Sequence, residues 1–262
     1  MSAFLELRGV SAGYGGRRDC RRRQHSRGKI ALRDIDLSVG QGELLVLAGP
    51  NGSGKTTLLK TAAGILPPLE GRVTINGKDV ANMKPRERAA FTAILFQVRD
   101  SPWPFTVRET IAQGRFARHG WLGAETREDR EAINNALEKA DLAGLAERPI
   151  TELSGGELQR VYIARSIAQG AAFLLFDEPE NNLDPKYAYV ILTLVETLVR
   201  EGRGAIVSLH DLRLASRFAH RIALLSPSGA ISAIGTAAEV LREDILSEVF
   251  DLSPELVKSM VL

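Results

Sequence analysis

The sequence predicts an α/β protein with an α-helical subdomain inserted midway along the chain. Short apolar segments typical of strands alternate with helical segments near both ends, whereas residues 107–168 have apolar residues at helical spacing and few strand candidates. The chain has 262 residues, of which 44% are hydrophobic and 25% are charged. This composition is ordinary for a globular protein and excludes a disordered or collagen-like chain.

Three features bear on where the protein works. No apolar run approaches the roughly 18 residues of a membrane-spanning helix. The first residues, MSAFLELRGV, lack the basic region and apolar core of a signal peptide. The single cysteine, Cys20, excludes an internal disulfide framework. We therefore expect a protein without a membrane span of its own, in a reducing compartment.

Strand candidates dominate the first hundred residues. Residues 4–10 alternate as in an edge strand, and ELLVLA at residues 43–48 is a short apolar run that ends at glycine, typical of a buried strand. Asn76-Gly77 is a strong hairpin-turn signal. The remaining elements expected here are a strand around residues 35–39, a helix through Leu58 and Leu59, and strands at residues 73–75 and 92–96.

The second half returns to strands after the helical block. Within that block, Thr126–Ala140 predicts a charged amphipathic helix. Strands are expected at residues 172–176, 205–208, 221–225 and 230–234, followed by short helices. We expect residues 1–96 and 166–262 to form the core with an antiparallel β subdomain, and residues 97–165 to form the helical subdomain.

A glycine-rich segment matches the phosphate-loop pattern G-x-x-x-x-G-K-[ST] between a predicted strand and a predicted helix. Its glycines let backbone N–H groups surround a phosphate, and the helix directs its positive end at the same anion. Lys55 should reach the β- and γ-phosphates, and the Thr56 hydroxyl should bind Mg²⁺. The alternative is a plain glycine-rich turn. The predicted ATP-binding residues here are Gly49, Pro50, Asn51, Gly52, Ser53, Gly54, Lys55, Thr56 and Thr57.

Two acids end the predicted strand at residues 172–176. In α/β sheets ligands bind at the carboxyl ends of strands. Asp177 fits the Mg²⁺-binding acid of a P-loop NTPase (RecA-like) core, and Glu178 is placed to polarise an attacking water. The alternative is that both acids only cap the next helix.

The octet Leu153-Ser154-Gly155-Gly156-Glu157-Leu158-Gln159-Arg160 predicts a second anion-binding helix start. Together with the phosphate loop before it and Asp177-Glu178 after it, the octet resembles the signature of the ATP-binding cassette (ABC) ATPases. In that family two subunits pack head to tail. The resemblance implies that Ser154, Gly155, Gly156 and Glu157 close over the ATP of a second subunit.

Other residues agree with this resemblance. Tyr14 resembles the aromatic residue that stacks on adenine, although a lone tyrosine also suits an edge strand. Gln97 resembles the glutamine that touches Mg²⁺ and links the core to the helical subdomain. Asp184 resembles the aspartate of the loop at the dimer interface. His210 resembles the histidine that contacts the γ-phosphate, although a histidine at a strand end is more often structural.

The resemblance implies an ATPase that uses ATP and Mg²⁺, in which Glu178, His210 and Gln97 serve hydrolysis. It also implies a head-to-tail dimer with a second copy or a paralogue, a multi-span membrane permease, a substrate-binding protein, and a peripheral location on the cytoplasmic side of the cell membrane. No nucleic-acid partner is expected. The alternatives are a cassette acting on ribosomes or DNA and a regulatory cassette that does not hydrolyse ATP.

A finer resemblance concerns the cargo. Residues 104–109 (PFTVRE) and the run from His210-Asp211-Leu212 to Gly235-Thr236 look like the ATPases of iron-siderophore, haem and cobalamin importers. The resemblance implies import of one of these or of a related metal chelate. ATPases for another transport substrate are the alternative.

The chain also departs from the family. Residues 1–33 carry nine basic and two acidic residues, and most of the basic ones lie in the stretch Arg17–Lys29. About a dozen residues more than usual separate Tyr14 from Ala31. This basic stretch is either a solvated loop or a contact for anionic lipid or for the permease. Glu180 stands where Thr or Ser is common, and Glu157 replaces the more common Gln, although either can hydrogen-bond a ribose.

Overall fold

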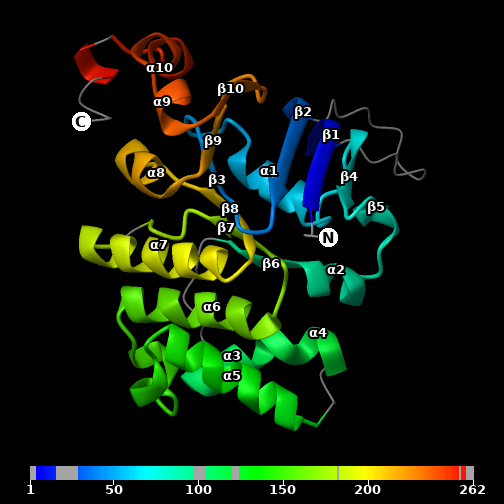
Figure 1. The fold of residues 1–262 in the computed structure, drawn as a ribbon, viewed down its shortest axis with the longest axis vertical. Helices are drawn as coiled ribbons and strands as arrows, with labels where there is room; N and C mark the ends of the chain where they lie inside the picture. The colour runs from blue at the N-terminus through cyan, green and yellow to red at the C-terminus, as the bar shows by residue number, and fades with distance from the viewer. Residues whose placement is uncertain are drawn as a thin grey trace.

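The computed structural model describes residues 4–15, 29–96, 104–119, 124–181, 183–253 and 255–257. Two sheets and their flanking helices make up most of the molecule (Figure 1). The helices α3, α5 and α6 gather at one end, and α9 and α10 lie at the opposite end. No helix within the described ranges has the length and apolar character needed to cross a membrane.

Within the described residues, the larger sheet has six strands in the order β10-β9-β3-β8-β7-β6. All neighbours pair in parallel except β10, which returns antiparallel on β9. The parallel strands therefore end at one edge. The strand bounds are β3 Leu44–Ala48, β6 Thr92–Leu95, β7 Phe173–Asp177, β8 Gly204–Ser208, β9 Arg221–Leu225 and β10 Ile231–Gly235.

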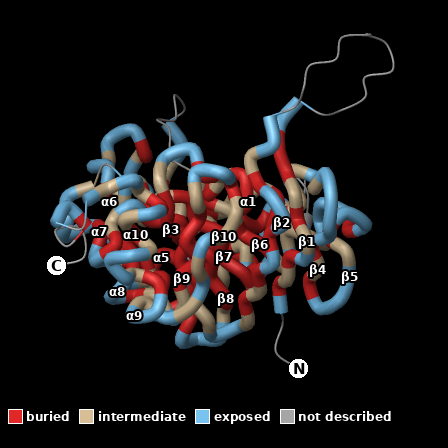
Figure 2. The backbone as a smooth tube through the Cα atoms, turned by 90° about the horizontal axis from the view of Figure 1, so that it is seen from above, coloured by how far each residue is buried: buried red, intermediate tan, exposed pale blue. Residues whose placement is uncertain are grey.

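Each face of this sheet carries its own core, because successive side chains of a strand point to opposite faces. In β7, Phe173 and Leu175 enter the cluster that packs on α1 and the smaller sheet, whereas Leu174 and Phe176 enter the cluster formed with the other helices. All four side chains are fully buried. The buried positions in Figure 2 follow the strands accordingly.

The smaller sheet is antiparallel, with the order β2-β1-β4-β5. Asn76 and Gly77 join β4 to β5 with both φ angles positive, the hairpin geometry that this dipeptide predicts. The prediction of an edge strand at residues 4–10 was wrong, because β1 pairs with β2 on one side and β4 on the other. The bounds are β1 Phe4–Tyr14, β2 Lys29–Gly40, β4 Glu70–Ile75 and β5 Lys78–Asp79.

The helical block packs α3 and α5 against α6. A buried Arg115 side chain joins the start of α5 to the end of α6, since its Nε lies 2.6 Å from Asp129 Oδ1 and its guanidinium donates to the Ala168 carbonyl. The bounds are α3 Val107–Ala112, α4 Phe116–His119, α5 Arg127–Lys139 and α6 Gly155–Gln169. The predicted domain limit at 165/166 falls inside the continuous helix α6, and the domain division stays a prediction.

The remaining helices flank the larger sheet. They are α1 Lys55–Ala62, α2 Pro85–Phe91, α7 Pro185–Arg200, α8 Leu212–Phe218, α9 Ala237–Val240 and α10 Glu243–Phe250, with short 3₁₀ turns at Val80–Asn82, Gln113–Arg115, Ala143–Leu145 and Ile150–Glu152. The observed architecture confirms the predicted α/β fold class.

Candidate nucleotide-binding and hydrolysis site

The residues of the candidate site lie at the carboxyl ends of three neighbouring strands of the larger sheet. The phosphate loop follows β3, Asp177 is the last residue of β7, and Ser208 is the last residue of β8. Because β3, β8 and β7 are adjacent and parallel, the residues that follow them lie together.

The phosphate loop has a backbone that only glycine accommodates at two positions. Gly49 and Gly54 have φ angles of 141° and 103°, a region that side chains disfavour. A Cβ on Gly49 would lie 2.4 Å from the Leu225 carbonyl oxygen, and one on Gly54 would lie 2.7 Å from that of Ala31. Gly54 precedes α1 and offers no side-chain cap, so the first N–H groups of α1 have no side-chain partner from that residue.

Lys55 lies buried beneath this loop. Its Nζ donates to the carbonyl oxygens of Gly49 at 2.9 Å and Pro50 at 3.3 Å. Burial lowers the pKa of Lys55, and the carboxylates of Glu178 and Asp177 act in the opposite direction. These acids help keep the lysine charged and available to phosphate oxygens.

Ser53 supplies a further polar group inside the loop. Its Oγ is buried and has no hydrogen-bond partner among the described residues. A buried hydroxyl without a partner costs free energy until one arrives. The loop therefore fits a phosphate, which offers oxygen acceptors.

Asp177 is the centre of an oxygen-rich cluster. Its Oδ2 accepts a 2.7 Å hydrogen bond from Thr56 Oγ1, and its Oδ1 accepts a 2.8 Å bond from Ser208 Oγ. Hydroxyl and carboxylate oxygens are the ligands that Mg²⁺ prefers. The donor set present therefore fits the ion predicted for this position.

Glu178 and His210 meet beside this cluster. His210 Nε2 lies 2.5 Å from Glu178 Oε1. Glu178 has a φ angle of 50°, unusual for a residue with a side chain, and its N–H is held by the carbonyl and hydroxyl oxygens of Ser208. The alternative that Asp177 and Glu178 cap the next helix does not hold, because Asp184 is the N-cap of α7 and accepts from Lys186 N at 2.9 Å.

A hollow of about 330 Å³ is lined by part of the phosphate loop, the start of α1 and Glu178. Tyr14 lies at its wall with 47% of its surface exposed, which leaves the ring accessible to a base. Lys60 Nζ lies 5.9 Å from the centre of that ring. The other lining residues include Asn51, Gly52, Gly54, Lys55, Thr56, Thr57 and Glu178.

The signature residues lie apart from this hollow. Among the described residues, its lining includes none of Ser154, Gly155, Gly156 or Glu157. Ser154 caps α6, and the Glu157 carboxylate accepts from Ser154 N at 2.8 Å and from its hydroxyl at 2.7 Å. These bonds lower the pKa of Glu157. In this structure Glu157 therefore completes a capping box.

Sequence reasoning missed two residues that organise the site. The Ser208 hydroxyl hydrogen-bonds both Asp177 and Glu178. A hydroxyl residue at the end of a predicted strand is a sequence feature that could have indicated this role. Gln159, on α6, donates from Nε2 to the Pro179 carbonyl at 2.8 Å, which ties the signature helix to the turn after β7. Only the fold reveals that contact. Gln97 lies outside the described residues, and so does the basic stretch apart from its last residue, Lys29.

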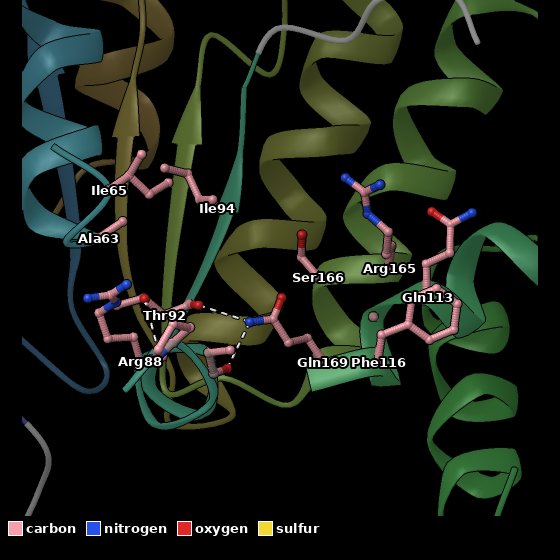
Figure 3. A pocket seen from close by; sticks show the side chains of 13 residues that line it. Ala63, Ile65, Arg88, Thr92, Ile94, Gln113, Phe116, Arg165, Ser166 and Gln169 are labelled. Atoms are coloured by element: carbon pink, nitrogen blue, oxygen red, sulfur yellow. Dashed lines mark hydrogen bonds between the residues drawn. The ribbon is translucent and has the colours of Figure 1, made fainter. Parts of the chain in front are cut away.

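A second hollow, of about 480 Å³, lies where the helical block meets the sheet (Figure 3). Gln169, at the end of α6, donates from Nε2 to the carbonyl oxygens of Ala89 at 2.8 Å and Thr92 at 2.9 Å. Arg88 and Arg165 line the hollow, and Ile65 at its rim is 54% exposed. This surface combines apolar and cationic groups.

Comparison with known proteins places this geometry in a family. The ABC transporter family model matches residues 32–181. The chain is 41% identical over 230 residues to the iron(3+)-hydroxamate import ATP-binding protein FhuC of Bacillus subtilis (strain 168), covering 87% of this chain and 85% of that one. It is 41% identical over 235 residues to the hemin import ATP-binding protein HmuV of Streptomyces coelicolor, covering 89% and 82%.

A solved structure agrees with the fold and the chemistry. The chain resembles a dimeric ATP-binding cassette in a post-hydrolysis state bound to ADP and Pi, with a TM-score of 0.74, 27% identity and coverage of 89% of this chain and 98% of the other. The family match spans the phosphate loop and both acids at the end of β7. The chain therefore belongs to the ABC transporter family and is an ATP-hydrolysing cassette subunit.

Proposed function

We propose that this ATPase hydrolyses ATP at the edge of the larger sheet, with Glu178 polarising the attacking water and His210 orienting the site. The 2.5 Å approach of His210 Nε2 to Glu178 Oε1 is the observation that carries this proposal. Lys55 and the loop N–H groups hold the phosphates. Tyr14 stacks on adenine.

Mg²⁺ belongs to this proposal through Thr56, Asp177 and Gln97. When bound, the ion supplies positive charge that neutralises the phosphate oxygens. The Thr56–Asp177 hydrogen bond already brings two of these oxygens together.

We further propose that a second copy of the chain, or a paralogous cassette, completes the site with Ser154, Gly155, Gly156 and Glu157, and that Asp184 lies at this interface. The separation of the signature from its own chain's hollow supports a shared site. The dimeric cassette bound to ADP and Pi supports it as well.

The cargo follows from the relatives. FhuC and HmuV are named as import ATP-binding proteins for iron(3+)-hydroxamate and hemin. We propose that this chain powers import of an iron-siderophore, haem, cobalamin or a related metal chelate through a separate multi-span permease, with a substrate-binding protein, from the cytoplasmic side of the membrane.

The hollow between the helical block and the sheet is the surface that we assign to the permease. Its exposed Ile65 and the nearby arginines suit a segment with apolar and acidic side chains. Because Gln169 ties α6 to Ala89 and Thr92 at this place, force applied here reaches the signature helix.

Uptake in the native host tests both assignments. Cells that lack this chain should lose import of one labelled cargo among iron-hydroxamate, haem and cobalamin, and the wild-type chain should restore it. Ile65→Glu should restore less than a tenth of the uptake, because a charge replaces an apolar contact, while purified Ile65→Glu keeps its ATPase activity. Normal uptake of all three cargoes without the chain would contradict import of an iron-siderophore, haem or cobalamin. Full uptake with Ile65→Glu would contradict the docking surface alone.

A further inference from the structure

Glu180 occupies the turn between β7 and α7, and the roles proposed above do not use it. Its Oε1 accepts a 3.2 Å hydrogen bond from the backbone N–H of His210. Its Oε2 is buried and has no hydrogen-bond partner among the residues that the structure describes. The Glu180 side chain therefore connects the turn after β7 to His210 in the loop after β8.

The backbone beneath Glu180 is fixed from two directions. Gln159 on the signature helix holds the carbonyl of the preceding Pro179 at 2.8 Å. The carbonyl of Glu180 itself accepts from Leu183 N at 3.2 Å. The carboxyl group is therefore presented to His210 from an anchored base.

The charges around Glu180 explain its state. Burial raises the pKa of Glu180 to about 7, hydrogen bonds from the backbone oppose that rise, and the nearby acids Glu178 and Asp211 add to it. Lys55 from α1 also faces this group of acids. A substantial fraction of Glu180 is therefore neutral at pH 6.5, and an amide of the same length reproduces that form.

The two contacts of His210 divide between backbone and ring. Its N–H is held by Glu180 and its Nε2 lies against Glu178. If the backbone contact is lost, the loop after β8 gains freedom and the ring loses a fixed approach to Glu178. Small displacements of catalytic groups cost rate rather than substrate affinity.

We infer that Glu180 is a positioning residue for hydrolysis, holding the His210 backbone through its side-chain oxygen so that the imidazole meets Glu178. This inference rests on the roles proposed for Glu178 and His210. It assigns a purpose to the acid that stands where Thr or Ser is common in the family.

Steady-state ATP hydrolysis at pH 6.5 tests the inference with three variants of Glu180. Glu180→Met removes the acceptor at nearly constant length and should lower kcat about tenfold, the order expected for one lost hydrogen bond, with KM for ATP within about twofold. Glu180→Gln keeps an acceptor and should stay within about threefold of wild type. Glu180→Asp keeps the carboxyl but shortens its reach, and should lose kcat as Glu180→Met does.

Glu43 provides the matched control. Its Oε2 also accepts a backbone N–H, that of Gly40 at 3.0 Å, but it precedes β3 at the opposite end of the strand from the phosphate loop. Glu43→Met should leave kcat within twofold. If Glu180→Met does not fold, the comparison of Glu180→Asp with Glu180→Gln decides the question.

The position of His210 can be read without hydrolysis. Its ring resonance, assigned by its loss in His210→Asn, should shift in Glu180→Met and return in Glu180→Gln, while the other three histidines stay in place. An unmoved resonance together with unchanged kcat in Glu180→Met, or equal losses in Glu180→Gln and Glu180→Met, would overturn the inference. A shifted resonance in a protein whose His210→Asn variant hydrolyses normally would instead overturn the proposed role of His210.

Discussion

Two helices of the chain, α1 and α6, begin next to glycines but differ in how their N-termini are capped. At the start of α1, Gly54 has a left-handed backbone and provides no side-chain cap. At the start of α6, the Ser154 hydroxyl and the Glu157 carboxylate close a capping box. The N-terminus of α1 therefore has no side-chain cap, whereas the N-terminus of α6 is capped by its own side chains.

The two helix N-termini also differ in the charge of their first turns. The first turn of α1 has no acid and begins with Lys55, whereas the first turn of α6 contains Glu157. A helix N-terminus favours an anion by roughly 0.3–1 kcal/mol at an exposed site, and a carboxylate in the first turn already uses that advantage. The start of α1 is therefore open to an anion, whereas the start of α6 already holds a carboxylate of its own.

Removing the cation of the α1 start should impair ATP binding, the first step on which the other predicted effects depend. Lys55→Ala should weaken ATP binding by about a hundredfold or more, because a charge-assisted contact to the phosphates disappears from a buried site. Isothermal titration with ATP measures this change. Lys78→Ala, an exposed lysine paired with Glu87 away from the site, is the control and should bind normally. Wild-type affinity in Lys55→Ala would refute the assignment of the α1 start.

Blocking hydrolysis should show both helix starts acting on one nucleotide. Glu178→Gln should keep ATP binding, lose about 10²–10³-fold in turnover, and accumulate as a closed dimer, because the shared ATP is not consumed. Size-exclusion chromatography with light scattering in ATP and Mg²⁺ measures the mass. Glu131→Gln, which alters an exposed pair with Arg127, should behave as wild type. Elution of ATP-loaded Glu178→Gln as a monomer would contradict the shared site.

Neutralising the acid of the α6 start should have the smallest effect. Added to Glu178→Gln, the change Glu157→Gln keeps a capping-box acceptor but removes the charge. The ATP-dependent dimer should become about two- to fivefold tighter at low salt, and the gain should vanish at high salt. Analytical ultracentrifugation measures the dissociation constant. Glu109→Gln makes the equivalent change in the capping box of α3 and should leave the dimer unchanged. A weaker dimer in Glu157→Gln would show instead that the carboxylate itself binds the partner.

The same acid gives a sign for the pH dependence of stability. The pKa of Glu157 is lowered in the folded chain by its bonds to Ser154. The stability that Glu157 contributes is therefore present above its pKa in the unfolded chain, and it is lost as the pH falls through its lowered pKa in the folded chain. The difference in unfolding free energy between wild type and Glu157→Gln should shrink in acid.

One prediction from the sequence failed, and one residue stayed without a role, where the partners come from distant parts of the chain. Period-two alternation indicated a strand at residues 4–10, but it does not tell how many neighbours the strand has, and β1 lies between β2 and β4. Glu180 had no assigned role, since its acceptor atom meets a residue 30 positions along the chain.

The sequence by itself determined the α/β class, the phosphate loop and the order of the motifs, because glycine spacing, short apolar runs and helical periodicity are local signals. It also predicted the Asn76-Gly77 turn, whose geometry is dictated by two adjacent residues. Only the tertiary structure decided that Ser208 holds Asp177 and Glu178, that Gln159 reaches Pro179, and that Glu180 holds His210. The physical reason is that parallel strands bring together the residues after their carboxyl ends, whatever their separation in sequence.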